Sequence, residues 1–488
     1  MAAMRHWMFV ALALCACDRG AAVGPPGVDA ALEAGPVDRG TPPPDAVLDA
    51  ALLDVGLDMW PRDAAPRDAE VDMEPFEVGP PPYSLDAAVD PSTLELSVVQ
   101  DWVPVLNGTA FQKRAEMTLD VLPSGRKLRV PLLYVAPAQG CPCNFFVVDG
   151  GFTPEVRAID SVVESLLAVR VGMVAVGIAP LADLGPDGEA AAAELQILFE
   201  RTGNLRYTEL WLWGYAYMRA ATAALTELDR FSPNRIGAAG RSRGGLGATT
   251  AVIQDPRFVA LSAWLTPLAQ LPPDVLPEGL TGRARRRVKF DAQQMSLPIL
   301  HTEALDQRRV DLFFHNASND LQTPGLLEAG RLDREFPMCI EPNVGHGVVF
   351  RPQGAPVPVA QPFQDTRLAV LEFSLSRGSR LMTPPLLSAT VVGDTMTVLA
   401  RFRTVPRPDN ATLWFTYDRA PDSERAYEDA VWQNVPMSRL DNSTFVVTLP
   451  TPPAGVRAVD AFSYHTDVAV GRPRAVSSAY SRFTLVDE

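Results

Sequence analysis

The stretch Arg235-Ile-Gly-Ala-Ala-Gly-Arg-Ser-Arg-Gly-Gly245, followed by Leu246 to Ile253, decides how this chain folds. The residues before Gly240 predict a short buried strand, and those from Leu246 onward predict a helix. A sharp strand-to-helix turn needs small residues two positions before and after its central serine, because larger side chains would collide there. Gly240-Arg-Ser-Arg-Gly244 meets this requirement. The stretch therefore predicts that Ser242 is presented as a nucleophile, although a glycine-rich turn with a solvated serine is the simpler alternative.

Strand and helix patterns alternate on both sides of this turn. The run from Leu210 to Leu228 has helical periodicity, and Pro123-Ser-Gly-Arg126 is typical of a hairpin turn between two antiparallel strands. Alternation of this kind predicts a mostly parallel sheet with helices on its faces. We expect an α/β-hydrolase fold over residues 91–380. The other apolar runs that predict its strands are Phe145–Val148, Gly172–Ile178, Phe258–Thr266, Arg309–Phe314 and Pro337–Ile340.

Two regions depart from this alternation. Residues 267–300 are rich in proline, basic from Arg283 to Arg287, and are expected to form an insertion near the site, outside the core. After Thr383, short β-like runs follow one another with turn residues between them and without helices. Residues 381–488 are therefore predicted to form a β-sandwich of the immunoglobulin or fibronectin-III kind. Its expected strands are Thr395–Phe402, Ala411–Tyr417, Thr444–Leu449, Asp460–Thr466 and Tyr480–Val486.

A nucleophilic serine needs a base and an acid, which this fold supplies after late strands in the chain order serine, acid, histidine. His346 lies in Pro342-Asn-Val-Gly-His-Gly347, after the last predicted strand, where glycines let the loop return over the serine. Asp320 lies just past the preceding strand and is a better candidate than Asp311 inside it. The alternatives are a surface loop histidine and a turn-capping aspartate. The other histidines are excluded by their positions: His6, His301, His315 and His465.

Further residues are candidates for binding a developing oxyanion or a substrate. The backbone N–H of Arg243 and an N–H from Gly150 or Gly151 are expected to form the oxyanion hole. The two glycines also fit a plain strand-to-helix turn. The side chains of Arg241 and Arg243 could bind a substrate carboxylate or assist the oxyanion, or they could make structural ion pairs.

The N-terminal residues predict export. The apolar run Trp7–Ala16 is too short to span a bilayer as a helix and is typical of a signal peptide. Leu14-Cys-Ala-Cys17 resembles the bacterial lipobox, so residues 1–17 are expected to be a lipoprotein signal peptide, with acylation of Cys17. An ordinary signal peptide with incidental cysteines is the alternative. The sequence therefore predicts a lipid-anchored protein of the bacterial cell envelope, on the periplasmic face or the cell surface.

Composition limits the partners of the chain. Residues 18–90, built largely from Ala, Asp, Pro, Gly and Val, cannot bury enough apolar area to offset their ordering entropy, so a disordered tether is expected. The net charge of −15 argues against nucleic acid, which requires a clustered cationic surface. Five cysteines make no disulfide framework. We expect no metal and no cofactor.

Several motifs resemble, in register, those of the PhoPQ-activated pathogenicity-related proteins. The resemblance covers most of the region from Val147 to the C-terminus and implies an exported α/β-hydrolase-like protein without a defined substrate. It also implies the serine at Ser242, the acid at Asp320 and the histidine at His346. The motifs are Val147-Val-Asp-Gly-Gly151, Trp213–Leu228, Asp255-Pro-Arg-Phe258, Pro342–Gly347, Leu413-Trp414, Trp432 and Gly455-Val-Arg-Ala458.

The Ser242 turn departs from that family's pattern. Arg243 stands where the family has lysine, Gly244 where it has arginine, and Leu246 where it has tryptophan. The serine–arginine pair and the later Gly-Ala resemble the corresponding turn of glucuronoyl esterases, but the downstream regions do not follow that family.

Two classes of function follow from these patterns. The first is a serine hydrolase that cleaves an ester or amide bond of a small molecule or peptide through an acyl-enzyme. The second is a cell-surface binding or signalling lipoprotein that keeps the fold without activity, since fold does not dictate function. A polysaccharide-associated adhesin acting through the β-sandwich is a variant of the second.

Overall fold

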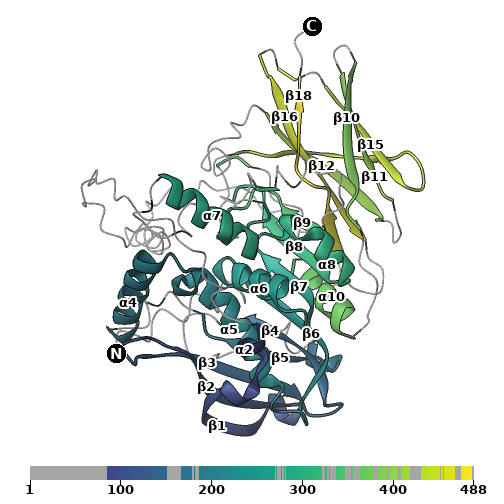
Figure 1. Ribbon diagram of the computed structural model, residues 1–488. Coiled ribbons are helices and arrows are strands. Elements are labelled where there is room, and N and C mark those ends of the chain that lie inside the picture. The colour runs from purple at the N-terminus through teal and green to yellow at the C-terminus, as the bar shows by residue number, and fades with distance from the viewer. Residues whose placement is uncertain are drawn as a thin grey trace, which may run out of the picture. The chain divides into compact units, whose positions relative to one another are not determined.

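The largest sheet in the described part of the computed structural model has the strand order β1-β2-β3-β5-β4-β6-β7-β8-β9 (Figure 1). Strands β1, β2 and β3 pair antiparallel, β3 also pairs antiparallel with β5, and the strands from β5 to β9 are parallel. This order, with β4 and β5 exchanged, is the α/β-hydrolase fold, as predicted. The strands are β1 Glu95–Val105, β2 Ala110–Val121, β3 Lys127–Pro137, β4 Cys143–Asp149, β5 Gly172–Val176, β6 Phe231–Arg241, β7 Phe258–Trp264, β8 Asp311–Ala317 and β9 Met338–Glu341.

The structure describes most of the chain from Leu85 onward. The described residues are 85–150, 166–178, 181, 186–269, 271, 276, 280, 282–320, 325, 326, 329, 337–346, 353–355, 363–376, 383–392, 395–403, 408–417, 430–450, 452, 453, 455–467 and 474–485. The predicted signal peptide, the lipidation site Cys17, most of the predicted tether and Gly151 lie outside them.

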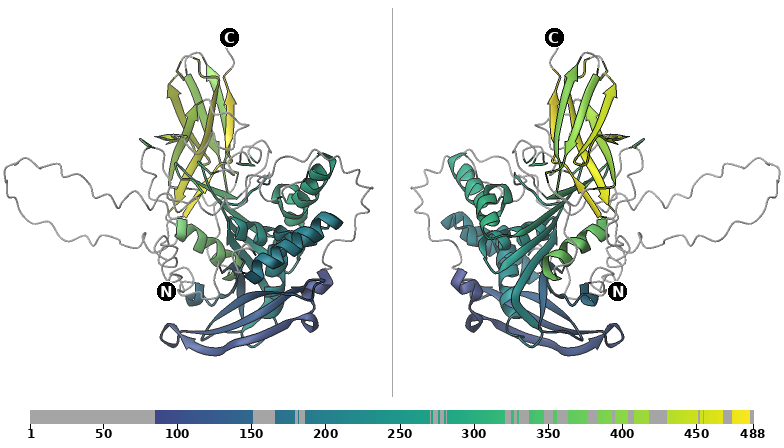
Figure 2. Two further views of the ribbon diagram at one scale, coloured as in Figure 1. Left: turned by 90° about the vertical axis from the view of Figure 1, so that its left-hand side faces the viewer. Right: turned by 90° about the vertical axis from the view of Figure 1, so that its right-hand side faces the viewer.

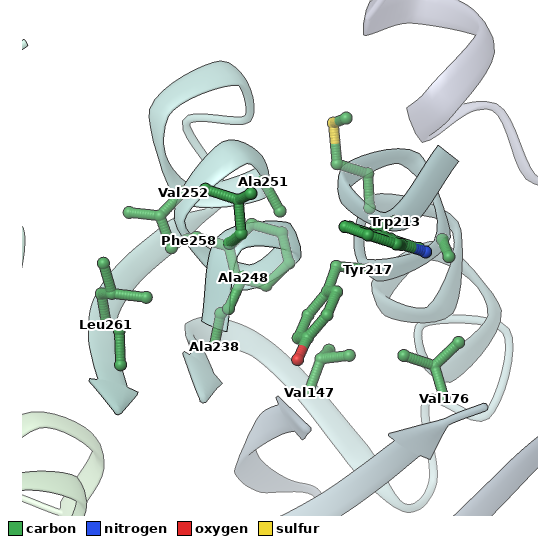
Figure 3. Close-up of a cluster of buried hydrophobic side chains, with 14 of the residues drawn as sticks. Val147, Val176, Trp213, Tyr217, Ala238, Ala248, Ala251, Val252, Phe258 and Leu261 are labelled. Carbon is green, nitrogen blue, oxygen red and sulfur yellow. The ribbon is translucent and has the colours of Figure 1, made fainter. Parts of the chain in front are cut away.

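Helices cover both faces of the sheet, because its parallel strands are apolar on both sides. Helices α5 (Glu209–Ala224) and α6 (Arg243–Gln254) pack on one face, and α10 (Phe363–Ser376) packs on the other, as Figure 2 shows. Alternate residues of β4 and β6 supply the two cores. Figure 3 shows the α5 side, where Trp213 and Tyr217 lie over Val147 and Ala238. On the α10 side, Leu371 and Leu375 join a separate cluster with the next residues along β4 and β6, Phe146 and Ala239.

The proline-rich region 267–300 was expected to stay outside the core, and this expectation is wrong. It contains helix α7 (Gly282–Ser296), which packs against α6. Val288, Ala292 and Met295 lie one turn apart and are buried in the main core. The arginines at its start do not interrupt the helix, because straight-chain basic residues are good helix formers. Other helices are α2 Leu85–Val89, α4 Pro186–Thr202 and α8 Thr302–Gln307.

The C-terminal region forms two antiparallel sheets, as predicted. One has the order β10-β11-β15-β14 and the other β13-β12-β16-β17, with β18 paired to β16. Apolar residues of both sheets, including Val398 of β11 and Leu413 of β12, share one core, which makes the pair a sandwich. The strands are β10 Leu386–Val392, β11 Thr395–Arg401, β12 Asn410–Tyr417, β13 Gln433–Pro436, β14 Ser438–Arg439, β15 Thr444–Pro450, β16 Ala458–Asp467, β17 Arg474–Ser477 and β18 Ser481–Thr484.

The sandwich and the hydrolase fold belong to one compact unit, Val78–Glu488. The aromatic side chains of Trp432, Phe462 and Tyr480 are buried in the same apolar cluster as the core of the large sheet. The predicted boundary at residues 380 and 381 therefore separates two architectures that share a core.

The predicted tether ends earlier than expected. Its last residues, Leu85–Val89, form helix α2, and Ala88 is buried against α5. The Arg219 guanidinium of α5, 2% exposed, donates hydrogen bonds to the carbonyl oxygens of Ala87 and Asp90 at 2.8 and 3.0 Å. The Thr222 hydroxyl donates to Ala88 O at 2.7 Å. The composition of the segment hid this helix, because its anchoring residues lie far away in the sequence.

The three described cysteines are not bonded to one another. Cys141 and Cys143 lie at the start of β4 with their Sγ atoms 3.4 Å apart, and burial together with the Cys141 thiol raises the pKa of Cys143. Cys339 is buried in β9, which the three strands β6, β7 and β8 separate from β4, so it is too distant to form a disulfide with either of the other two cysteines. Among the described helices, none is long and apolar enough to cross a membrane.

The attachment of α2 predicts a difference between two shortened chains. A chain that begins at Tyr83 keeps α2, whereas one that begins at Ser92 removes the carbonyl oxygens of Ala87 and Asp90 to which the buried Arg219 donates. An unpaired buried donor costs about 1–3 kcal/mol, so the shorter chain should melt at a lower temperature. Calorimetry of both chains measures this difference. Equal melting temperatures would show that α2 contributes nothing to the fold.

Candidate active site

Ser242 lies at the junction of β6 and α6 in a strained backbone conformation, with φ 50° and ψ −118°. Non-glycine residues rarely adopt this region, and strain of this kind gathers at functional sites. Hydrogen bonds on both sides hold it in place. The Ser242 N–H donates to Trp264 O at 2.8 Å, and its carbonyl accepts from the Leu246 N–H at 2.9 Å. The side chain consequently stands out from the carboxyl end of the sheet.

The glycines around Ser242 are required by crowding. A Cβ on Gly240 would collide with the backbone of Gly244, and one on Gly244 would collide with the Asp149 carboxylate. The hydroxyl of Tyr217 fills the remaining space, within hydrogen-bonding distance of Ala239 O at 2.8 Å and Gly244 O at 3.0 Å. Burial and the nearby Asp149 charge hold the pKa of Tyr217 well above its usual value, so it stays a neutral donor. The predicted turn has the expected geometry.

The structure brings the predicted serine, histidine and aspartate together. His346 Nε2 lies 2.8 Å from Ser242 Oγ, and His346 Nδ1 lies 3.1 and 3.0 Å from the two carboxylate oxygens of Asp320. With its proton on Nδ1, the imidazole donates to Asp320 and accepts from the serine hydroxyl. Asp320 is fully buried, whereas 33% of the His346 side chain is exposed. The imidazole therefore has one face open to a reacting molecule.

Two neighbouring strands position the acid and the base. Asp320 follows β8 and His346 follows β9, and parallel pairing places both strand ends at the same edge of the sheet. The two turns are also joined directly. Ser318 N–H donates to Glu341 O at 2.9 Å, and Asn319 N–H donates to Val344 O at 3.0 Å.

The alternatives weighed from the sequence lie elsewhere. Asp311 begins β8 and forms an ion pair with Arg235 at 3.1 Å, away from the carboxyl end of the strand. His315 is buried inside β8, and His301 contacts Gln294 O beside α7. His465 is buried in the sandwich, where desolvation lowers its pKa to about 3.

The backbone N–H groups that were predicted to bind the oxyanion differ in whether they already have an acceptor. Arg243 is the first residue of α6, so its N–H belongs to the first helical turn, which has no intrahelical acceptor. The Gly150 N–H donates to Val176 O at 2.8 Å and is engaged in the strand-to-loop turn. A Cβ at Gly150 would approach that same carbonyl at 3.2 Å. Gly150 thus serves the turn and does not present its N–H, and Gly151 lies outside the described residues.

The two arginines beside Ser242 have different surroundings. Arg241 donates from Nη2 to the carbonyl of His346 at 2.9 Å. Its side chain is exposed, yet enough protein surrounds the guanidinium for desolvation to lower its pKa, against the opposing effect of Asp320 and Asp149. The Arg243 guanidinium lies 5.9 Å from the centre of the Trp213 ring, in a cation–π contact. The Arg241 side chain therefore contacts the histidine loop, whereas that of Arg243 lies over α5.

The sequence did not single out Tyr217, Asn319 or Asn343, which support the turns of the site. Asn343 is buried and has φ 56°, and asparagine is among the few residues that tolerate this region. Within the described residues, no three His, Cys, Asp or Glu side chains gather in a way that could hold a metal ion.

Comparisons with known proteins give matches among solved structures only. No protein-family model matches the sequence, and no curated protein matches it. Among solved structures, a glucuronoyl esterase from Solibacter usitatus is similar at 16% identity, covering 47% of this chain and 69% of the other, with a TM-score of 0.30. Acetyl xylan esterase 1 from Thermoanaerobacterium sp. JW/SL YS485 is similar at 15% identity over 54% and 85% of the two chains, with a TM-score of 0.34. Similarities at this level concern the fold alone.

Crowding at the serine turn predicts the effect of one methyl group. Gly244→Ala should destabilise the protein by about 1–3 kcal/mol, because the new Cβ displaces the Asp149 carboxylate from a filled space. Gly237→Ala in β6, the strand that leads to Ser242, is the control, since its Cβ would meet the end of the Leu375 side chain at 3.3 Å and Phe146 Cβ at an ordinary contact distance of 3.5 Å. Thermal unfolding of both variants compares them. A Gly244→Ala protein as stable as the control would contradict the crowding described here.

Proposed function

We propose that the chain is a serine hydrolase that cleaves an ester or amide bond of a small molecule or peptide through Ser242, His346 and Asp320. One observation carries the proposal. A continuous line of hydrogen-bonding contacts runs from Ser242 Oγ through the imidazole of His346 to the buried Asp320 carboxylate. The serine of this line sits on a strained turn that leaves it accessible.

In the first half of the reaction, Ser242 Oγ attacks the carbonyl carbon while His346 Nε2 accepts the hydroxyl proton. Asp320 orients the imidazole and stabilises the imidazolium that forms. The carbonyl oxygen gains negative charge in the tetrahedral intermediate, and the Arg243 N–H at the start of α6 is a donor for it. His346 Nε2–H then gives its proton to the leaving oxygen or nitrogen, which departs and leaves an acyl-serine.

Water completes the cycle by the same route. His346 takes a proton from the water molecule as its oxygen attacks the acyl-serine, and then returns the proton to Ser242 Oγ when the acid is released. The exposed part of the His346 side chain provides the side from which water approaches.

A positive charge beside the serine favours an acyl group that carries a negative charge nearby. Arg241 is exposed, and its bond to the His346 carbonyl fixes the guanidinium at the edge of the site. A guanidinium in that place suits a carboxylate, which it can bind with two parallel hydrogen bonds. Esters of acidic compounds are therefore the first substrates to assay.

The proposal extends to the cellular setting and the relatives of the chain. Leu14-Cys-Ala-Cys17 after the apolar run supports a lipid anchor at Cys17 and a place in the bacterial cell envelope. The motifs from Val147 to Gly347, together with Trp432, support kinship with the PhoPQ-activated pathogenicity-related proteins.

Substitution of the serine and histidine tests the mechanism. Ser242→Ala and His346→Ala should each lower turnover by a factor on the order of 10³ or more, and combining them should cost little further, because the two groups act as one unit. Hydrolysis rates on an ester and peptide library measure this, and labelling with a fluorophosphonate reports the serine directly. Labelling of Ser242→Ala at the parent rate excludes the mechanism. A parent chain inert to the library and the label favours a binding protein.

The lipid anchor has its own test. Cys17→Ser should release the protein from membranes, whereas Cys15→Ser, preceded by Leu14, should leave it bound. Cell fractionation followed by mass spectrometry of the N-terminal peptide measures both. Equal membrane retention of the two variants would contradict acylation at Cys17.

A further inference from the structure

The histidine loop follows β9, a strand at one edge of the large sheet. Among the described residues, only β8 pairs with β9 within that sheet, so the other side of the β9 backbone lies open to other contacts. The C-terminal domain covers part of this side, where the Ile340 N–H donates to Ser477 Oγ of β17 at 2.9 Å. The element that carries the proposed base is therefore supported from outside the hydrolase fold.

Direct contacts reach the histidine loop itself. The side-chain amide of Asn343 donates from Nδ2 to Trp432 O at 3.0 Å and accepts at Oδ1 from the Trp432 N–H at 2.8 Å. Both residues are fully buried, so water does not replace these bonds. Asn343 lies three residues before His346.

A parallel contact reaches the acid turn. Asn319, the residue before Asp320, donates from Nδ2 to Ala430 O at 2.7 Å. Ser318 links the two turns, because its hydroxyl accepts from the Asn343 N–H at 2.8 Å and donates to Asn319 Oδ1 at 2.7 Å. One short segment, Ala430–Trp432, thus contacts the turns of both proposed partners of the serine.

The segment is itself held firmly by the C-terminal domain. The Trp432 ring lies 5.2 Å from the ring centres of both Phe462 and Tyr480, and all three side chains are fully buried. Aromatic pairs at such distances stabilise by about 0.5–1.5 kcal/mol beyond their buried area. The backbone of Trp432 is therefore a fixed point against which Asn343 is placed.

We infer that Ala430–Trp432 is a positioning element for the proposed reaction. Asn343 and Asn319 are the positioning residues: through their bonds to this segment, Asn343 holds the loop of His346 and Asn319 holds the turn of Asp320. The C-terminal domain then helps to hold the proposed active-site residues in place and is not only a separate binding module. This inference rests on the proposed function. A displacement of about 1 Å can cost about 10²-fold in rate, so loss of these bonds should lower the reactivity of Ser242.

The test compares two substitutions in the full chain. Asn343→Gly removes both bonds to Trp432 and tolerates the left-handed backbone of that position. Thr366→Val is the matched control, because it removes another hydrogen bond to the C-terminal domain, from Ala475 N–H to Thr366 Oγ1 at 3.0 Å, that reaches neither turn. If Asn343→Gly does not fold, Asn319→Ala makes the same comparison from the acid side.

Two readouts are taken at a temperature where both variants are folded by circular dichroism. In Asn343→Gly, fluorophosphonate labelling of Ser242 should slow by about 10²-fold. The downfield proton NMR signal of the His346 Nδ1–H bonded to Asp320 should be lost. Both readouts should be unchanged in Thr366→Val.

The outcomes separate the two claims. Parent-like labelling and a retained His346 proton in Asn343→Gly would overturn the positioning role and leave the serine hydrolase intact. Equal losses in Thr366→Val would also overturn the positioning role, since a general weakening of the contact between the C-terminal domain and the hydrolase fold would then be the cause. If the parent chain is not labelled but its His346 proton disappears in Asn343→Gly, the positioning role stands and the proposed function fails.

Discussion

The backbone of Ser242 is the constraint on which the rest of the site depends. A serine at φ 50° persists only where its surroundings hold it more strongly than the strain opposes it. Here the holding comes from β7 through Trp264 O, from the first turn of α6, and from the Tyr217 hydroxyl beneath the turn. The absence of a Cβ at Gly240 and Gly244 lets these parts meet. Ser242 is therefore placed by packing in the middle of the sheet.

The acid and the histidine are placed by different means, because they come from the margin of the sheet. β8 and β9 bring their turns to the same edge as Ser242, but within the described part of this sheet β9 pairs with β8 alone. Hydrogen bonds between the two turns and from the C-terminal domain supply the remaining support. The site thus joins Ser242, which is held in the middle of the sheet, to two turns at its edge that the C-terminal domain supports. All of these parts belong to one compact unit.

The sequence predicted the parts of this arrangement that have local causes. The order of strands and helices follows from periodicity, the serine turn from its glycines, and the acid and histidine from chain order after late strands. Contacts between distant residues left no local sign. Helix α2 depends on Arg219, the carbonyl acceptors of Asn319 and Asn343 come from the C-terminal domain, and Gly150 gives its N–H to Val176. Helix α7 was missed because prolines and the arginines from Arg283 to Arg287 dominate this region, although its buried residues have the helical spacing of three and four positions.

The chain order of the contacts around Asn343 has a consequence for synthesis of the chain. Ser242, Asp320 and His346 all precede Ala430 and Trp432, so a chain that is still emerging, N-terminus first, carries its nucleophile before the partners of Asn319 and Asn343 exist. A fragment released by early termination, or cut between the two architectures by a protease, lacks them permanently. Completion of the chain is thereby coupled to completion of the site, and an unfinished molecule holds Ser242 without the partners of the turns that carry Asp320 and His346.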